Sequence, residues 1–415
     1  MTSAQELLKT KNGGRFGREL RKEFLFEDGY VNLNHGSFGT YPRAVRDVLR
    51  SFQDAHEARP DDFILYDYPK LNDEARIALS KLLNVPTPSL VLVQNATTAI
   101  NIVLRNLIFS PGEHILYTST IYGACEKAIA YITETTPALA AKIEYTFPVE
   151  DDWLVAAFAA KIDEIEGKGG KVKVAVFDTV VSAPGVRLPF ERWLHVPRGC
   201  AVFHVPLRNQ HLIRSTLPTS HGFQPKPIPP FGSQTNPLPP SNREKSDFEI
   251  SFEFIGTVDT SPYLCIPAAI AWRESIGGED AIITYCQTLA LEGSKRMAEI
   301  LGTEILDNKT GTLTKCPMVN VALPLDPKTM FELGKSKGLD EQEVGTAIKN
   351  WSKRLFLDEY NTFMFTMFYA GRWWVRMSAQ VYLEMADFEW AAEVVKKVCK
   401  TAEKGGWAVK AKARL

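Results

Sequence analysis

Short, mainly apolar runs alternate with apolar stretches at helical spacing along the first half of the chain, and this alternation constrains the fold more than any other feature. Four runs have the length and composition of strands: 90–93, 114–117, 172–177 and 199–205. Two stretches between them have the apolar spacing of helices: 99–108 and 124–132. Strands that alternate with helices form parallel sheets covered by helices on both faces. The pattern predicts an α/β fold whose large domain has three layers, α/β/α, around a mostly parallel sheet.

The chain has 415 residues, which is enough for two domains with separate cores. We assign residues 30–280 to a large domain. We assign residues 281–415, with an N-terminal arm at 1–29, to a smaller C-terminal α/β domain, because helix and strand candidates also alternate there. Residues 217–242 are rich in Pro, Ser, Asn and Gly, which predicts a long loop instead of a regular element.

The charge balance limits the class of partner. The net charge is −1 and the pI is about 6.7, so the chain lacks the basic footprint of proteins that bind nucleic acid or anionic membranes. No apolar run approaches the length of a membrane span. We therefore expect a small-molecule ligand, and neither nucleic acid nor a membrane as a partner.

Cysteine placement and the two ends of the chain bear on location. The six cysteines are scattered, with no C-x-x-C pair and no zinc spacing to histidines, so we expect no metal site and a reducing compartment, the cytoplasm. The first twenty residues lack the apolar core of a signal peptide. The C-terminal Ala413-Arg414-Leu415 resembles a relaxed peroxisomal signal, and a frayed basic tail is the alternative.

A polar turn, Asn95-Ala96-Thr97-Thr98, joins the first predicted strand to the helix that follows it. The first backbone N–H groups of a helix have no partner within the helix, and the helix dipole adds positive charge there. Such a turn is suited to bind phosphate. The alternative is a plain helix cap, since Asn and Thr are common at that position.

Several motifs together carry a family resemblance: Asn34-His35-Gly36-Ser37-Phe38-Gly39, Asn95-Ala96-Thr97-Thr98, Ile121-Tyr122-Gly123-Ala124, Gly256-Thr257-Val258-Asp259 and Val375-Arg376-Met377-Ser378-Ala379-Gln380-Val381-Tyr382. With them the chain resembles the isopenicillin N epimerase-like branch of the class V aminotransferase family, over nearly its whole length. Within that branch it is most similar to fungal hercynylcysteine sulfoxide lyases. The resemblance implies the fold-type I transferase fold and pyridoxal 5'-phosphate (PLP) as cofactor.

The resemblance also implies how the cofactor is held. Thr97 and Thr98 would bind the PLP phosphate, and Ser182 would approach the ring. Tyr122 would stack on the ring and pass protons, and a half-buried tyrosine at a strand end is the alternative. Thr257 would reach the phosphate bound by the neighbouring subunit, so a homodimer with composite sites is expected.

On the substrate side, the resemblance places Arg376 against the α-carboxylate of an amino acid, because a guanidinium fork binds a carboxylate through two parallel hydrogen bonds. The alternatives are that Arg372 takes this place, or that both are surface arginines beside Trp373 and Trp374. Asn34 and His35 would line the substrate entrance. His35 could equally be a turn residue that bonds its own backbone.

The spacing between two predicted strands is too short for this fold. About twenty residues separate the strand at 172–177 from the strand at 199–205, whereas a βαβ unit takes roughly thirty or more in total. The family carries here the lysine that binds PLP covalently and the aspartate that keeps its ring nitrogen protonated. Arg192 stands in the place of the lysine and cannot replace it, because a guanidinium stays protonated. Asp178 matches a different family position. The segment with both groups is therefore expected to be missing near 190–197.

The resemblance implies a PLP-dependent C–S lyase acting on a sulfur-linked amino acid, of the hercynylcysteine sulfoxide lyase type in ergothioneine biosynthesis. The chain as written is expected to be inactive because the lysine is absent. The alternatives are an epimerase or cyclase of fungal secondary metabolism, and a non-catalytic pseudoenzyme or dimerisation partner. An altered transcript and a natural pseudoenzyme are both open as the origin of the gap. Either way, loss of central strands leaves backbone groups unpaired and predicts reduced stability.

Overall fold

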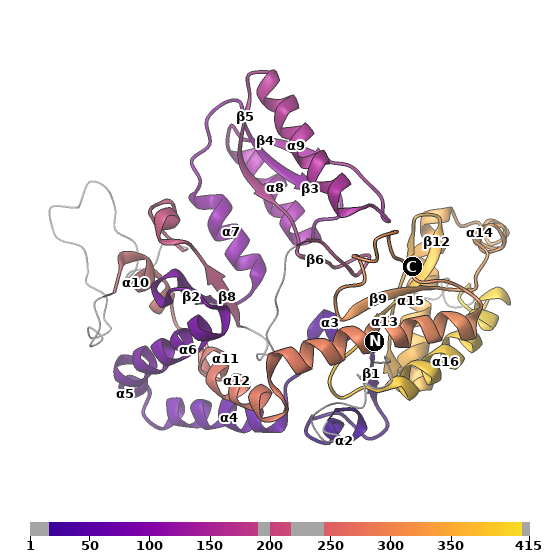
Figure 1. The fold of residues 1–415 in the computed structure, drawn as a ribbon, viewed down its shortest axis with the longest axis horizontal. Coiled ribbons are helices and arrows are strands. Elements are labelled where there is room, and N and C mark those ends of the chain that lie inside the picture. Colours follow the sequence, from indigo (N-terminus) through magenta and orange to yellow (C-terminus); the bar gives the residue numbers. More distant parts are fainter. Residues whose placement is uncertain (1–15, 190–199, 217–244, 409–415) are drawn as a thin grey trace.

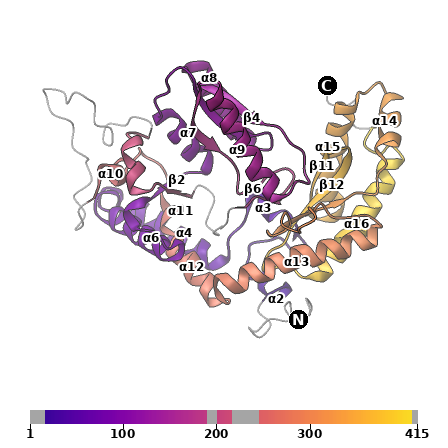
Figure 2. The same cartoon turned by 45° about the horizontal axis from the view of Figure 1, so that its top comes forward.

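The computed structural model describes residues 16–189, 200–216 and 245–408. Four sequence features lie outside these ranges: most of the N-terminal arm, the gap near 190–197 with Arg192, the proline-rich segment 217–242 and the C-terminal tripeptide 413–415. Figures 1 and 2 show two connected parts, with the long helix α13 (Gly278–Leu301) running from one to the other. The domain boundary predicted at residue 280 falls near the start of this helix and stays a prediction.

A parallel sheet forms from three of the alternating strands, in the order β4 (Leu139–Ile143), β3 (Glu113–Thr118), β5 (Lys171–Val176). Two helices connect them: α8 (Gly123–Thr135) and α9 (Asp151–Gly167). Ile115 of β3 lies in a core with residues of α8, whereas the next residue, Leu116, lies in a core with residues of α9. Successive strand residues point to opposite faces, so the two helices cover opposite faces and produce three layers.

A second, separate sheet contains two antiparallel strands, β2 (Leu90–Val93) and β8 (Ala201–His204). Their neighbours are α6 (Tyr68–Leu83), α7 (Ala96–Asn106), α10 (Asp247–Glu253), α11 (Ser261–Leu264) and α12 (Ile266–Ser275). Val91 and Val93 pack against apolar residues of α7 and α10, and Leu90 and Leu92 pack against α6, α11 and α12. Both faces of β2 are therefore buried, as its uninterrupted apolar sequence requires.

The strands predicted to share one sheet are thus divided between two. Within the described residues β5 pairs with β3 alone, and β8 pairs with β2 alone. Figure 1 shows β2 and β8 lying apart from the sheet of β3, β4 and β5. Between β5 and β8 the described chain forms only a small hairpin, β6 (Val180–Val181) with β7 (Val186–Arg187). A short hairpin cannot supply the crossover that would join the two sheets.

The C-terminal part is built on an antiparallel sheet in the order β11 (Phe365–Tyr369), β12 (Arg372–Ser378), β9 (Met318–Ala322). Its helices are α13, α14 (Pro327–Lys335), α15 (Glu341–Tyr360) and α16 (Met385–Glu403). The N-terminal segment joins it: α2 (Arg18–Arg21) contributes Leu20 to the same core, and β1 (Val31–Asn32) pairs with β10 (Thr362–Phe363). Two segments more than 300 residues apart in sequence therefore share one core.

The remaining helices of the first part are α3 (His35–Phe38), α4 (Arg43–Ala58) and α5 (Pro60–Asp62), followed by a π-helical turn at Phe63–Asp67. The sequence patterns did not predict β4 or α9. The helix predicted at 99–108 begins earlier, at Ala96, because Asn95 caps it. Among the described residues, no helix combines the length and apolar character needed to cross a membrane.

Candidate active site

Tyr122 and Asp178 lie together at the carboxyl ends of the parallel strands. Tyr122 follows β3 and Asp178 follows β5, and the Tyr122 backbone N–H donates to Asp178 Oδ2 at 2.8 Å. Ligands of open α/β sheets bind at this edge. Burial raises the pKa of Asp178, and the Tyr122 N–H opposes that shift. The phenol of Tyr122 is 51% exposed, so it can stack on a ligand ring.

The Asn95–Thr98 turn opens α7, at the carboxyl end of β2. Asn95 caps the helix, because its Oδ1 accepts from the Thr98 N–H at 2.8 Å and from Thr98 Oγ1 at 3.0 Å. The cap interpretation therefore holds for Asn95. The N–H groups of Ala96 and Thr97 also lie in the first turn, where a helix supplies no partners. The turn thus fits a phosphate, and the roles of Thr97 and Thr98 in binding it stay predictions.

Arg376 lies at the centre of the best-defined cluster. It sits in the middle of β12 and is 2% exposed. One terminal nitrogen, Nη1, donates to the backbone oxygen of Ser182 at 2.5 Å. The other, Nη2, donates to Asn34 Oδ1 at 2.9 Å and to Ser37 Oγ at 2.6 Å. The guanidinium also lies 4.9 Å from the ring centre of Phe365, within range of a cation–π contact.

No carboxylate pairs with Arg376 among the residues that the structure describes, and its Nε has no hydrogen-bond partner there. Burial lowers the pKa of Arg376 to about 10, so the group is still charged at neutral pH. A buried charge with only neutral partners is costly, and an anion would offset that cost. The cluster therefore fits a carboxylate ligand, and the alternative of a surface arginine does not hold for Arg376.

Two glycines give this cluster its shape. A Cβ at Gly185 would lie 2.4 Å from Arg376 Cδ, and a Cβ at Gly36 would lie 2.4 Å from Met318 Sδ. Any side chain at either position would displace its neighbour. The Gly185 carbonyl accepts from Asn320 Nδ2 at 3.0 Å, which ties the β6–β7 hairpin to β9. The hairpin is thereby held where the Ser182 carbonyl meets Arg376.

His35 lies next to Asn34, but its ring contacts Tyr382 instead of Arg376. Its Nδ1 is 2.9 Å from the hydroxyl of Tyr382, which is fully buried. Burial lowers the pKa of His35 to about 4, and the nearby positive charge of Arg273 adds to the shift. The ring is therefore neutral at pH 7 and anchors α3. Its predicted place at the substrate entrance stays a prediction.

Thr257 is exposed on the turn that follows α10. The far side of this turn is fixed by Asp259, whose Oδ2 accepts from Gln53 Nε2 at 2.8 Å and whose Oδ1 accepts from the Ser261 N–H at 2.9 Å. No hydrogen bond among the described residues joins Thr257, Thr97 or Thr98 to the Arg376 cluster. The predicted reach of Thr257 toward a neighbouring subunit therefore stays a prediction.

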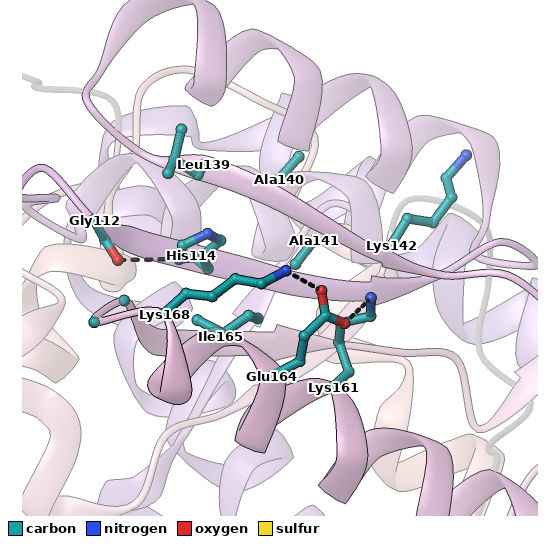
Figure 3. A pocket seen from close by; sticks show the side chains of 12 residues that line it. Gly112, His114, Leu139, Ala140, Ala141, Lys142, Lys161, Glu164, Ile165 and Lys168 are labelled. Carbon is teal, nitrogen blue, oxygen red and sulfur yellow. Dashed lines mark hydrogen bonds and ion pairs between the residues drawn. The ribbon is translucent and has the colours of Figure 1, made fainter.

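A separate cavity lies away from this site. It has a volume of about 430 Å³ and lies at the amino ends of the parallel strands, lined by Gly112, by His114 of β3 and by residues of α9 and β4 (Figure 3). Lys161 and Lys168 both donate to Glu164, at 2.6 and 2.8 Å, so their charges are partly neutralised within the cavity wall. Because ligands of such sheets bind at the opposite, carboxyl edge, we place the site at Arg376 and Tyr122.

The described residues fit the phosphate of PLP and the carboxylate of an amino-acid substrate, but they supply no lysine for the aldehyde of PLP. The Asn95–Thr98 turn suits the PLP phosphate, and Arg376 suits an amino-acid carboxylate. No lysine is among the described contacts of Arg376, Tyr122 or Asp178. In the same described part, no cluster of three or more His, Cys, Asp or Glu side chains is arranged to hold a metal ion.

Sequence reasoning missed three members of the site. Ser37 and Phe365 contact the guanidinium directly, and Gly185 makes room for it. Ser37 stood inside a quoted motif, so its neighbour Asn34 could have drawn attention to it. Phe365 and Gly185 carry no local signal, because their contacts with β12 depend on sheet register and on the path of the hairpin.

Comparisons with known proteins agree with this picture. No family model matches the chain. The L-cysteine desulfhydrase-like protein lolT1 of Epichloe uncinata is 34% identical over 440 residues, which covers 92% of this chain and 96% of the relative. The hercynylcysteine sulfoxide lyase of Schizosaccharomyces pombe is 24% identical over 427 residues and covers 92% of this chain and 98% of the relative. Both alignments are longer than the chain itself, so they contain positions at which this chain has no residue.

Solved structures show the same fold. The cystine C–S lyase C-DES, in complex with cysteine persulfide, matches with a TM-score of 0.61 at 16% identity, over 90% of this chain and 98% of that one. The cysteine desulfurase CsdA of Escherichia coli matches with a TM-score of 0.57 at 14% identity, over 92% and 98%. The predicted α/β fold is confirmed. The chain belongs to the class V aminotransferase family of PLP-dependent fold-type I enzymes, in the branch that holds L-cysteine desulfhydrase-like proteins and isopenicillin N epimerases.

Proposed function

We propose that this chain carries the binding site of a PLP-dependent C–S lyase for a sulfur-linked amino acid, and that the chain as written does not turn the substrate over. The observation that carries the first half is the Arg376 cluster, where a buried guanidinium faces only neutral described partners. Its relatives named as cysteine desulfhydrases and a sulfoxide lyase support an amino-acid substrate with a C–S bond.

Each residue of the site has a separate task in this proposal. Arg376 binds the substrate carboxylate, and Asn34 and Ser37 hold the guanidinium in place. The Asn95–Thr98 turn binds the cofactor phosphate, and the exposed ring of Tyr122 covers the cofactor ring. PLP, when bound, draws electrons from the substrate α-carbon. Asp178 orients the Tyr122 segment through its hydrogen bond to the Tyr122 N–H.

The absence of turnover follows from the missing lysine. The described chain between β5 and β8 holds one small hairpin where the family has a crossover, and the curated relatives contain residues that this chain lacks. We propose that these residues include the block with the lysine and the aspartate. The Arg376 cluster is intact in this chain, which favours an altered transcript over a natural pseudoenzyme.

Two other functions stay in view. An epimerase or cyclase would use the same carboxylate site, and a stretch of this chain is 36% identical over 99 residues to the isopenicillin N epimerase of Streptomyces clavuligerus. A non-catalytic partner is favoured by the exposed and well-anchored Thr257, which could complete the phosphate site of a full-length subunit. We also propose that the chain forms a homodimer, that it has a role in ergothioneine biosynthesis, and that it is located in the cytoplasm or the peroxisome.

The test uses the purified chain and a stable ligand, phosphopyridoxyl-L-alanine, the secondary amine obtained when borohydride reduces the imine of PLP and L-alanine. This ligand carries both the phosphate and the carboxylate and needs no lysine. We expect wild-type protein to bind it more tightly than phosphopyridoxyl-ethylamine, which lacks the carboxylate, and Arg376→Lys to abolish that preference, because an ammonium lacks the planar fork. Equal affinity of the wild type for both ligands would contradict the proposed site.

A second measurement tests the absence of turnover. Protein purified with PLP is treated with borohydride, which would fix any PLP attached to a lysine, and is then weighed by mass spectrometry. We expect no cofactor-sized increase in mass. An increase located on one lysine would show that another lysine has taken over the role, and the interpretation of the gap would be wrong.

A further inference from the structure

A buried cluster of five charged side chains lies between α6 and α10, outside the site described above. Its members are Asp73, Arg76, Lys245, Glu249 and Glu253. The side chain of Asp73 is 15% exposed, and each of the other four is 6% exposed or less. Buried ion pairs rarely stabilise a fold by more than apolar packing would, so a cluster of this size invites a second explanation.

Arg76 makes four hydrogen bonds to three different segments. Its Nε donates to the Leu90 carbonyl at 2.7 Å, and Nη1 donates to Asp73 Oδ1 at 2.9 Å. Its Nη2 donates to the Thr87 carbonyl at 3.1 Å and to Glu249 Oε1. The planar guanidinium thus ties α6 to the start of β2 on one side and to α10 on the other.

The bond to Leu90 caps the open edge of β2. The Val205 N–H donates to the Ser89 carbonyl, so the carbonyl of the next residue, Leu90, points away from β8. Unpaired edge groups need a partner, and Arg76 supplies one. The same strand ends at Val93 and leads directly into the Asn95–Thr98 turn. Arg76 therefore fixes the strand that carries the first phosphate-binding segment.

The bonds to α10 fix a second segment. Glu249 closes a capping box with Ser246 at the start of α10. Burial acts to raise the pKa of Glu249, but hydrogen bonds from Arg76 and Ser246 hold it below the usual value. At the last residue of α10, Glu253 accepts from Lys245, which also lies 3.0 Å from Asp73 Oδ2. The turn with Gly256 and Thr257 comes immediately after.

We propose that Arg76 is a positioning residue that couples the two phosphate-binding segments, the Asn95–Thr98 turn of its own subunit and the Thr257 turn offered to a neighbouring one. The ligand is the phosphate ester group of the cofactor. This inference rests on the proposed function, because it takes both segments to bind phosphate. One guanidinium sets the spacing of β2 and α10, so its loss moves the two segments relative to each other.

The test compares phosphopyridoxyl-L-alanine with pyridoxyl-L-alanine, which lacks the phosphate, on the full chain. Arg76→Lys keeps the charge but loses the fork that reaches Leu90, Thr87 and Glu249 together. We expect its preference for the phosphorylated ligand to fall by about tenfold or more, the scale found for partners that orient binding groups. Affinity for the unphosphorylated ligand should stay unchanged.

Arg21→Lys is the matched control. Arg21 of α2 donates to the buried Asp387 of α16 at 2.8 Å, and Figure 1 shows α2 and α16 apart from β2 and α10. It should lower the thermal midpoint and leave the phosphate preference intact. If Arg76→Lys fails to fold, Glu249→Gln takes its place, since the amide keeps the shape and one acceptor. A phosphate preference that survives a folded Arg76→Lys or Glu249→Gln variant would overturn the inference. No phosphate preference in the wild type would instead overturn the proposed function.

Discussion

Replacing Gly185 by alanine tests the carboxylate site without replacing any residue that would contact the ligand. The added Cβ would lie 2.4 Å from Arg376 Cδ and 2.9 Å from Cγ, both well inside ordinary contact distance. The arginine stem must therefore retreat by about 1 Å, a displacement that can reduce binding or rate by about a hundredfold. Forcing a methyl group into a packed core also costs about 1–3 kcal/mol of stability.

The effect should fall on the carboxylate. The hydrogen bonds from Arg376 to the Ser182 carbonyl, at 2.5 Å, and to Ser37, at 2.6 Å, leave no slack for a shift of that size. We expect Gly185→Ala to bind phosphopyridoxyl-L-alanine about 10- to 100-fold more weakly than the wild type, while its affinity for phosphopyridoxyl-ethylamine hardly changes. Isothermal titration calorimetry measures both affinities, and urea unfolding measures the loss of stability.

Gly345→Ala is the matched control. Gly345 lies inside α15, and a Cβ there would meet no atom within 4 Å. Alanine in a helix interior is expected to stabilise the fold by about 0.5–1 kcal/mol and to leave ligand binding unchanged. If Gly185→Ala loses stability but keeps its preference for the carboxylate ligand, Arg376 does not hold the carboxylate from the position seen here.

Two further predictions concern stability. Burial lowers the folded-state pKa of His35 to about 4 from 6.5, so the neutral ring stabilises the fold above pH 6.5 and this stabilisation is lost as the pH falls toward 4. Between pH 7 and pH 5 the free energy of unfolding of the wild type should fall by on the order of 2 kcal/mol more than that of His35→Gln, as measured by urea unfolding at both pH values. Equal losses would show that the ring is not buried as a neutral group. The proposal that a block is missing between β5 and β8 predicts the behaviour of a chimera that receives there the corresponding segment of the relative lolT1. It should melt at a higher temperature and gain a cofactor-sized mass on one lysine after borohydride treatment with PLP. A chimera that melts no higher than the wild type would show that the two sheets need no strands between them.

Local patterns predicted those elements whose apolar spacing or flanking turns are visible in a short stretch of sequence. The apolar run at 90–93 forms β2 at the expected place, and the polar turn after it leads into α7 as expected. β4 was missed since Leu139–Ile143 contains two alanines and a lysine, and strand pairing with β3 decides its state. The cap by Asn95 also decided the start of α7, which the apolar spacing alone put three residues too late.

The site divides in the same way. Motifs pointed to Arg376 and Asn34, and their contact at 2.9 Å joins residues 342 positions apart. No motif could show that the Ser182 carbonyl meets the same guanidinium, since that depends on where the β6–β7 hairpin is held. The ring of His35 turned toward Tyr382 for a similar reason: the buried hydroxyl lies on a segment far along the chain.

The sequence by itself indicated the alternation of strands and helices, the family and the short spacing between the predicted strands at 172–177 and 199–205, because these depend on local composition, motifs and spacing. Only the tertiary structure decided that β5 and β8 end in separate sheets, that Arg376 is buried without a described carboxylate, and that Arg76 joins β2 to α10. Strand pairing and the burial of charged side chains depend on contacts between segments that are distant in the sequence, and no local sequence pattern specifies those contacts.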